Sequence, residues 1–131
     1  MSTTPDDSAR CPCSSGDVFG GCCGPIIAGA PAPTAERLMR SRFTAFAIGD
    51  GDHLLRSWHP STRPGALDLD DATRWLWLEI VETVGGGPFD TEGTVAFVAA
   101  YRDGSGRGEL RERSRFVRER RNWLYLDGDV G

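Results

Sequence analysis

The chain has 131 residues, with 19 acidic and 15 basic side chains and a formal net charge of −4. This length suffices for one domain with its own core, since a domain of this size buries roughly two thirds of its unfolded surface. The acidic balance gives no general reason to expect a nucleic acid or an anionic membrane as partner. No apolar stretch approaches the ~20 residues of a membrane span.

A polar, acidic leader occupies residues 1–10. It has neither the basic start nor the apolar run of a signal peptide, so we expect it to be disordered and the protein to be cytoplasmic. A reducing cytoplasm keeps thiols out of disulfides, which bears on the cysteines that follow.

All four cysteines lie close together, as Cys-x-Cys, eight further residues, and then Cys-Cys. The surrounding residues 11–24 are rich in glycine and serine and poor in large apolar side chains, so we do not expect the cluster to form part of a core. Zinc binds four thiolates in a tetrahedron, and a sharply turning loop can wrap around one ion. The predicted ligands of one structural zinc ion are Cys11, Cys13, Cys22 and Cys23.

Two other interpretations of the cysteines stay open. Four cysteines permit three disulfide pairings, although a bridge between the adjacent Cys22 and Cys23 would be strained and the cytoplasm disfavours disulfides. The same two thiols could instead serve redox chemistry or trap soft metal ions. Zinc itself is an inference from the ligand type, because four thiolates also bind iron.

A proline- and alanine-rich stretch over residues 25–33 predicts a hinge. The zinc loop and this hinge together form an N-terminal unit (residues 11–33), which precedes a separate domain (residues 34–131). Thr34 is a suitable N-cap for a helix that ends near Gly49. Apolar residues recur at helical spacing between them, at Ala35, Leu38, Met39, Phe43, Phe46 and Ala47. A second short helix is expected to begin at Asp50 or Asp52.

The second half of the chain has the alternation of β-strands. Residues 75–83 predict a strand with Leu76, Leu78 and Ile80 on one face and Trp75, Trp77, Glu79 and Val81 on the other. Further strands are expected at 94–101, 109–119 and 122–127, of which the nearly continuous apolar stretch 94–101 should be central, with a hairpin turn at Asp103-Gly104. Helices followed by an antiparallel meander predict an α+β fold.

From Cys11 to Gly128 the chain resembles the YchJ family of small bacterial proteins. The segments that carry the resemblance are the cysteine loop, residues 29–42, residues 58–64, Leu78-Glu79-Ile80 and residues 112–116. The cysteine loop is similar to the SEC-C motif of the SecA translocation ATPase, which binds zinc, although Ser14 stands where that motif usually has glycine. The resemblance implies a nuclear-transport-factor-2-like (NTF2-like) cone, in which two N-terminal helices pack on a curved four-stranded antiparallel sheet.

Folds of this kind often open a pocket at the wide end of the cone, but the residues there decide its function. Polar candidates for such a pocket are His59, Glu79, Glu82, Glu92, Glu112, Arg113 and Ser114. If its aromatic neighbours desolvated Glu79, this carboxylate would suit general acid or base chemistry near neutral pH. Ordinary cross-strand ion pairs and local hydrogen bonds explain the same residues equally well, and no nucleophile–base spacing is evident, so we assign no catalytic residue.

The preferred interpretation is a cytoplasmic zinc protein whose cysteine loop presents a docking surface to a protein partner. The comparable loop of SecA binds a chaperone and lipids, which is the source of this expectation. The alternative is a small-molecule-binding protein or an enzyme that uses the pocket of the cone. The resemblance also implies that two copies could dimerise through the sheet.

Overall fold

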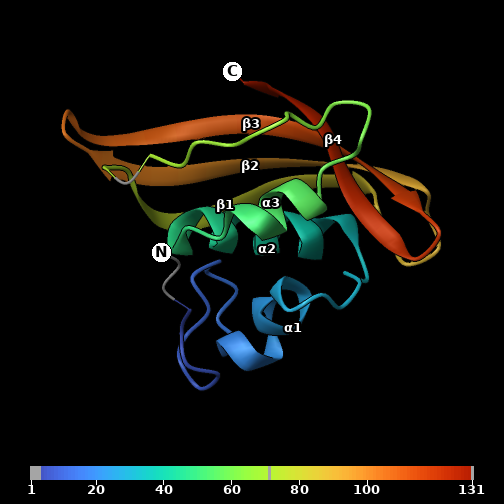
Figure 1. Ribbon diagram of the computed structural model, residues 1–131, viewed down its shortest axis with the longest axis horizontal. Coiled ribbons are helices and arrows are strands. Elements are labelled where there is room, and N and C mark those ends of the chain that lie inside the picture. Colours follow the sequence, from blue (N-terminus) through green and yellow to red (C-terminus); the bar gives the residue numbers. More distant parts are fainter. Residues whose placement is uncertain (1–3, 71, 131) are drawn as a thin grey trace.

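A four-stranded antiparallel sheet forms one face of the protein (Figure 1). In the computed structural model, which describes residues 4–70 and 72–130, the strands lie side by side in chain order. They are β1 (Arg74–Gly85), β2 (Glu92–Asp103), β3 (Gly106–Glu119) and β4 (Asn122–Val130). The predicted meander of four strands is therefore confirmed.

Strand β2 is central, as its apolar sequence predicted, and buries most of its length between β1 and β3. The hairpin to β3 closes where Asp103 pairs with Gly106, as expected from Asp103-Gly104. The turn from β3 to β4 passes through Arg120, whose φ of 61° lies in the left-handed region. Tight turns of this kind set the antiparallel register of consecutive strands.

Strand β1 departs from the predicted alternation because its pairing with β2 is irregular at two places, between Trp75 and Trp77 and between Ile80 and Glu82. The first irregularity is a bulge that shifts side chains to the other face of a sheet. As a result Trp75 packs against the core with Leu78, whereas Leu76 is exposed. The prediction that Leu76 shares the core face of Leu78 was wrong, because strict alternation does not survive a bulge.

Two helices pack beneath the sheet, as predicted (Figure 1). Helix α2 (Ala35–Ile48) begins where the Thr34 Oγ1 accepts a hydrogen bond from the Arg37 N–H (3.1 Å), and it ends at Gly49 with a φ of 79°. Helix α3 (Gly51–Arg56) is capped by Asp50, whose side chain accepts from the backbone of His53 (3.1 Å). Both caps satisfy backbone N–H groups that a helix start leaves unpaired.

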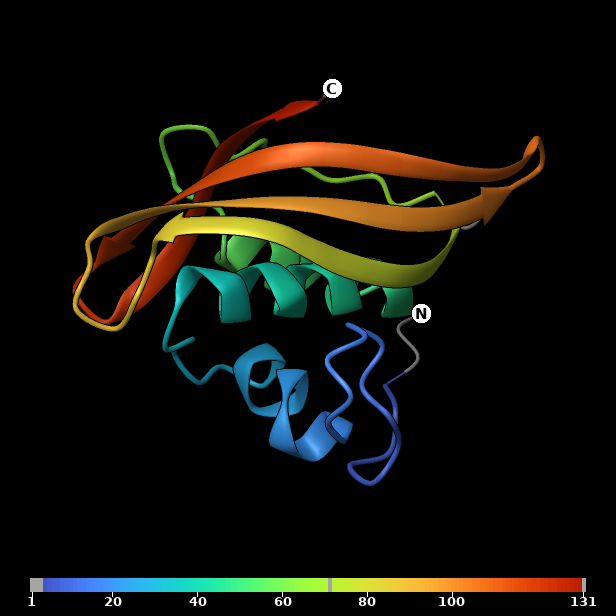
Figure 2. The same cartoon turned by 180° about the vertical axis from the view of Figure 1, so that it is seen from behind.

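The N-terminal segment forms a third layer below α2, on the side away from the sheet (Figure 2). It contains a single 3₁₀ turn, η1 (Phe19–Gly21), and a short helix, α1 (Cys23–Ile27), neither of which the sequence predicted. Part of the leader also pairs with this layer. The Phe19 N–H donates to the Ala9 carbonyl (2.7 Å), and an isolated antiparallel β-bridge pairs Arg10 with Val18. Residues 1–3 of the predicted disordered leader lie outside the described residues.

The proline- and alanine-rich stretch contacts the domain at a few residues, although most of the stretch is exposed. Ile26 and Ala32 are buried in the cluster that also contains the four cysteines, Leu38 of α2 and Val95 of β2. The Ile27 carbonyl accepts a hydrogen bond from Arg56 of α3 (2.8 Å). Composition alone does not distinguish an extended linker from an extended segment that packs, which is why the sequence predicted a hinge.

Candidate metal centre

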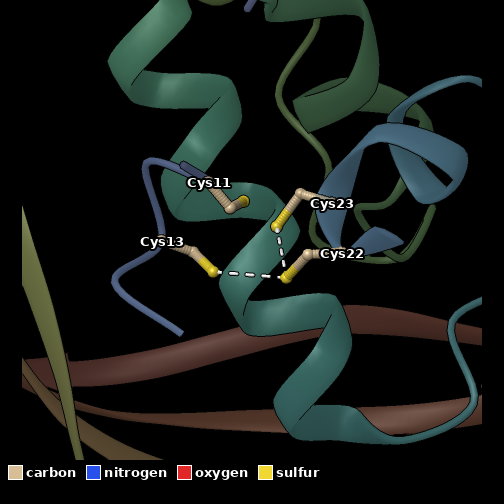
Figure 3. A group of neighbouring side chains, drawn as sticks. All are labelled: Cys11, Cys13, Cys22 and Cys23. Atoms are coloured by element: carbon tan, nitrogen blue, oxygen red, sulfur yellow. Dashed lines mark hydrogen bonds between the residues drawn. The ribbon is translucent and has the colours of Figure 1, made fainter. Parts of the chain in front are cut away.

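Four cysteine sulfurs converge between the N-terminal layer and α2 (Figure 3). All four Sγ atoms lie within 4.8 Å of one another, with 3.6 Å between Cys13 and Cys22 and 4.0 Å between Cys22 and Cys23. A tetrahedron with zinc–sulfur bonds of about 2.3 Å has sulfur–sulfur edges of about 3.8 Å. The donor set and its spacing therefore fit one tetrahedrally coordinated metal ion.

The sulfurs are also too far apart for disulfide bonds, which hold sulfurs about 2.05 Å apart. All four cysteines are free, and each is at most 3% exposed. Burial from solvent restricts access to the thiols, whereas redox or sensing chemistry requires access. The arrangement favours metal binding over both alternatives.

The chain brings the cysteines together as two pairs on separate short structures. Cys11 and Cys13 lie on a turn closed by the Cys11 N–H, which donates to the Asp17 carbonyl (2.9 Å). Cys22 is the N-cap of α1 and Cys23 is its first residue. Gly24 allows α1 to approach the turn before it, because a Cβ there would come within 2.8 Å of the Phe19 carbonyl oxygen.

Helix α2 supplies the other side of the centre through three residues at helical spacing. The Arg40 guanidinium donates to the Cys13 carbonyl (3.0 Å) and lies 4.0 Å from the Cys13 sulfur, and the Arg37 guanidinium reaches the Cys22 carbonyl (3.5 Å). The Thr44 hydroxyl is 3.8 Å from the Cys11 sulfur. Four thiolates around a divalent ion leave two negative charges in excess, and the two arginines face this charge. Such surrounding groups orient ligands and stabilise metal sites.

The thiols differ in how readily each ionises without a metal. Hydrogen bonds from Cys11 and Cys23 lower the pKa of Cys13. Burial raises the pKa of Cys22, and hydrogen bonding to Cys11 and Cys13, together with burial, raises that of Cys23. In this pattern Cys13 is the thiolate, and the neighbouring thiols stay protonated and donate hydrogen bonds to it. Ionising all four sulfurs in this buried space requires a cation among them, as metal coordination provides.

A second feature is a cavity of about 130 Å³ between α2 and the concave face of the sheet. Of the polar candidates from the sequence, Glu112 and Ser114 line it. The structure also places Arg42 of α2 in its wall, which the sequence analysis missed. The sequence does contain a sign of this position, because Arg42 falls within the apolar helical stripe of Met39, Phe43 and Phe46.

The remaining polar candidates lie elsewhere. His59 contacts Glu119 (3.0 Å) and Ser61 (2.7 Å), and Arg113 pairs with Glu82 (3.0 Å). Glu79 and Glu92 are exposed on β1 and β2. The desolvation expected for Glu79 therefore does not occur, because its side chain does not share the core face of Leu78. His59, Glu82 and Arg113 thus take part in surface contacts, and none of these candidates lines the cavity.

Comparison with known proteins identifies the relatives of this chain. The profile of the YchJ middle NTF2-like domain matches residues 34–128. The chain belongs to the YchJ family. A UPF0225 protein of Streptomyces coelicolor is 53% identical over 120 residues, covering 91% of this chain and 94% of that protein. A UPF0225 protein of Corynebacterium efficiens is 52% identical over 126 residues, covering 95% and 96%.

Two solved structures extend the YchJ likeness to the cysteine layer. A SEC-C motif containing protein from Rhodopseudomonas palustris superposes with a TM-score of 0.81 at 32% identity, over 92% of this chain and 98% of that one. Another from Psychrobacter arcticus gives a TM-score of 0.76 at 26% identity, over 95% and 85%. The predicted NTF2-like α+β fold with an N-terminal cysteine motif is confirmed. Among the described residues of this YchJ protein, no helix is long and apolar enough to cross a membrane.

Proposed function

We propose that this protein is a zinc-binding adaptor in which one structural zinc ion, held by Cys11, Cys13, Cys22 and Cys23, fixes a docking surface for a protein partner. The observation that carries the proposal is the convergence of four buried sulfurs within 4.8 Å, facing Arg37 and Arg40 of α2. The SEC-C description of the two structural neighbours supports zinc as the ion.

A closed set of four thiolates suits a structural role. Four protein ligands complete the tetrahedron of zinc, so the ion has no position for a water molecule or a substrate. The ion would instead hold the turn of Cys11 and Cys13 against the start of α1. Zinc therefore contributes rigidity here, and the chemistry of the site is binding.

The surface that the ion would make rigid is the outer rim of the cysteine layer. Gly16, Asp17, Val18 and Gly21 are exposed on this rim, and Val18 leaves 48% of its surface in contact with solvent. A small apolar group among polar neighbours on a rigid turn is suited to docking, because little conformational entropy is lost on binding.

The partner surface can be tested without disturbing the sulfurs. The tagged protein, Val18→Asp and Val84→Asp are each used to capture proteins from a lysate of the source cells. Val84, on the exposed part of β1 (56% exposed), is the matched control. We expect one identified protein to be captured by the wild type and Val84→Asp but lost with Val18→Asp. Equal capture by all three proteins, or no specific protein in any of them, would contradict the adaptor role.

A further inference from the structure

The cavity between α2 and the sheet has the features of a ligand site that is separate from the metal centre. We propose that it binds a small, uncharged organic molecule with an apolar body and an amide-type end, which accepts hydrogen bonds from Arg42 and donates one to Glu112. This inference does not depend on the metal or on the adaptor role.

The body of the cavity is apolar and largely aromatic. Its walls contain Met39, Phe43, Phe46, Trp75, Phe97, Ala99 and Leu110. Edge-to-face contacts fix the rings, since the centroid of Trp75 lies 6.1 Å from that of Phe43 and 5.5 Å from that of Tyr101. A cavity of about 150 Å³ with such walls admits benzene, so the volume of about 130 Å³ here suits a single ring or a short branched chain.

Arg42 provides a buried group of donors at one side of the cavity. Its residue is only 3% exposed, and its guanidinium lies 4.4 Å from the ring centre of Tyr125 and 5.2 Å from that of Trp58. Nη1 donates to the Leu54 carbonyl (2.8 Å) and to Ser57 Oγ (2.7 Å). Within residues 4–70 and 72–130 these are the only hydrogen bonds of the side chain, so the N–H groups on Nε and Nη2 stay available.

Burial makes this arginine unusual. Removing its charge from water lowers the pKa of Arg42 to about 10. In the part of the chain that the structure describes, no carboxylate forms an ion pair with it. A buried cation without a paired anion is costly, and an acceptor from a ligand would offset that cost.

Glu112, on β3, provides a negative charge opposite to that of Arg42. Its Oε2 accepts a hydrogen bond from Ser114 Oγ (2.6 Å), which fixes the carboxylate at the cavity wall. Gly128 faces Ser114 across the β3–β4 pairing, and a Cβ at that position would overlap the Glu112 carboxylate. The absence of a side chain at residue 128 therefore makes room for Glu112.

The charges of the lining determine the class of ligand. Among the described residues that form the wall, Arg42 and Glu112 are the only charged ones, and their opposite charges cancel. A carboxylate would be attracted by Arg42 and repelled by Glu112, and an amine would meet the reverse. A primary amide carries no net charge and holds an acceptor oxygen and a donor nitrogen on the same carbon, so it can satisfy both residues. The buried Trp58 Nε1, which has no partner among the described residues, is a further donor on a cavity-lining residue.

Three probes that share one aromatic ring and are similar in size test this assignment: benzamide, benzoate and benzylamine. Each is titrated into the isotope-labelled full chain, and binding is followed by chemical-shift changes. We expect benzamide to bind at least about tenfold more tightly than either charged probe, a difference of about 1.4 kcal/mol. Glu112→Gln should weaken benzamide binding and strengthen benzoate binding, because it removes the repulsion but keeps the size of the side chain.

A cavity-filling variant locates the binding. Ala99→Leu places a larger apolar group in the wall and is expected to abolish binding of benzamide while the spectrum stays that of a folded protein. The proposal is overturned if benzamide does not bind the wild type at about 10 mM, a concentration about tenfold above a Kd of about 1 mM. It is also overturned if benzoate binds best to the wild type, or if Ala99→Leu binds benzamide unchanged. If Ala99→Leu does not fold, Leu110→Phe serves in its place.

Discussion

At the scale of single residues, Ser14 shows how a departure from a motif can be accommodated. Its φ of 67° lies in the left-handed region, where glycine is the least strained residue, which accounts for the usual glycine of the SEC-C motif. The serine hydroxyl accepts a hydrogen bond from the Leu78 N–H of β1 (3.1 Å). The side chain thus links the cysteine layer to an edge strand of the sheet.

Matched substitutions at Ser14 separate the two effects. Ser14→Ala keeps the strained backbone and loses the hydrogen bond, so we expect a loss of about 1 kcal/mol in the free energy of unfolding. Ser14→Gly loses the same bond but relieves a strain of about 1 kcal/mol, and should stay close to the wild type. Denaturant titration measures both. Equal losses in the two variants would show that strain at residue 14 is negligible.

His53 is a buried histidine that stays neutral. Its residue is 3% exposed, and burial, with Arg56 and Arg42 nearby, lowers its pKa from 6.5 to about 4. The Ser41 hydroxyl donates its proton to the Leu38 carbonyl (2.7 Å). Its oxygen therefore accepts from His53 Nε2, which carries the proton of that hydrogen bond (2.9 Å). Nδ1 then accepts a hydrogen bond from Arg56 (3.4 Å). A second proton on Nδ1 would place a positive charge beside the Arg56 guanidinium.

This histidine predicts a loss of stability in acid. Between pH 6.5 and pH 4 the unfolded chain binds a proton at His53 that the folded protein does not, so the free energy of unfolding falls as the pH falls through this window. The shift from 6.5 to about 4 corresponds to about 3 kcal/mol of lost stability between pH 7 and pH 4. Denaturant titrations of the wild type and His53→Gln across this range measure it. The variant should lose about 3 kcal/mol less than the wild type, and parallel losses would contradict the assignment.

At the scale of elements, α2 contacts a different functional region on each of two faces. Arg37, Arg40 and Thr44 face the metal centre, and Met39, Arg42, Phe43 and Phe46 line the cavity. Both sets recur with the three- and four-residue steps that place side chains on one helix face. The sequence predicted the bounds of this helix and its apolar stripe but not the role of the arginines, because the layer that they contact comes from a segment expected to be separate.

The arginine face of α2 predicts a difference between two similar variants. Arg40→Gln removes a cation 4.0 Å from the Cys13 sulfur, and we expect metal affinity to fall about tenfold. Arg37→Gln removes only a long contact (3.5 Å) to the Cys22 carbonyl and should have a smaller effect. Competition with a chelator of known affinity measures both. If Arg37→Gln weakens metal binding as much as Arg40→Gln, then proximity to sulfur is not the cause.

Strand β1 has an irregularity that the sequence pattern did not predict. The sequence predicted residues 75–83 of this strand (Arg74–Gly85), but the bulge at Leu76 depends on how β1 pairs with β2. Pairing irregularities arise from contacts between distant segments. Alternation within one strand does not contain them, so Trp75 was assigned to the wrong face.

At the scale of the whole molecule, three layers share one core. Buried residues of the cysteine layer, α2 and the sheet form a single cluster that contains all four cysteines. The sequence predicted that the four cysteines converge, from their spacing, and predicted the sheet from its alternation. The expectation that the cysteine cluster lies outside any core was wrong, because glycine- and serine-rich loops give no sign of what they pack against.

A shared core predicts that metal removal affects the sheet as well as the loop. We expect a chelator to lower the melting temperature of the whole protein and to speed hydrogen exchange at the Leu78 amide, which Ser14 covers. Readdition of zinc should restore both. Faster exchange confined to residues 11–24, with the melting temperature unchanged, would mean that the cysteine layer is energetically independent of the domain.

The most direct test of the metal centre is native mass spectrometry of protein purified without chelator, combined with a titration of free thiols. The four convergent sulfurs predict one zinc ion per chain and protection of all four thiols until the metal is removed. A metal-free chain with four reactive thiols would contradict the structural role of zinc. A mass lower by two or four protons would show disulfides in place of a metal centre.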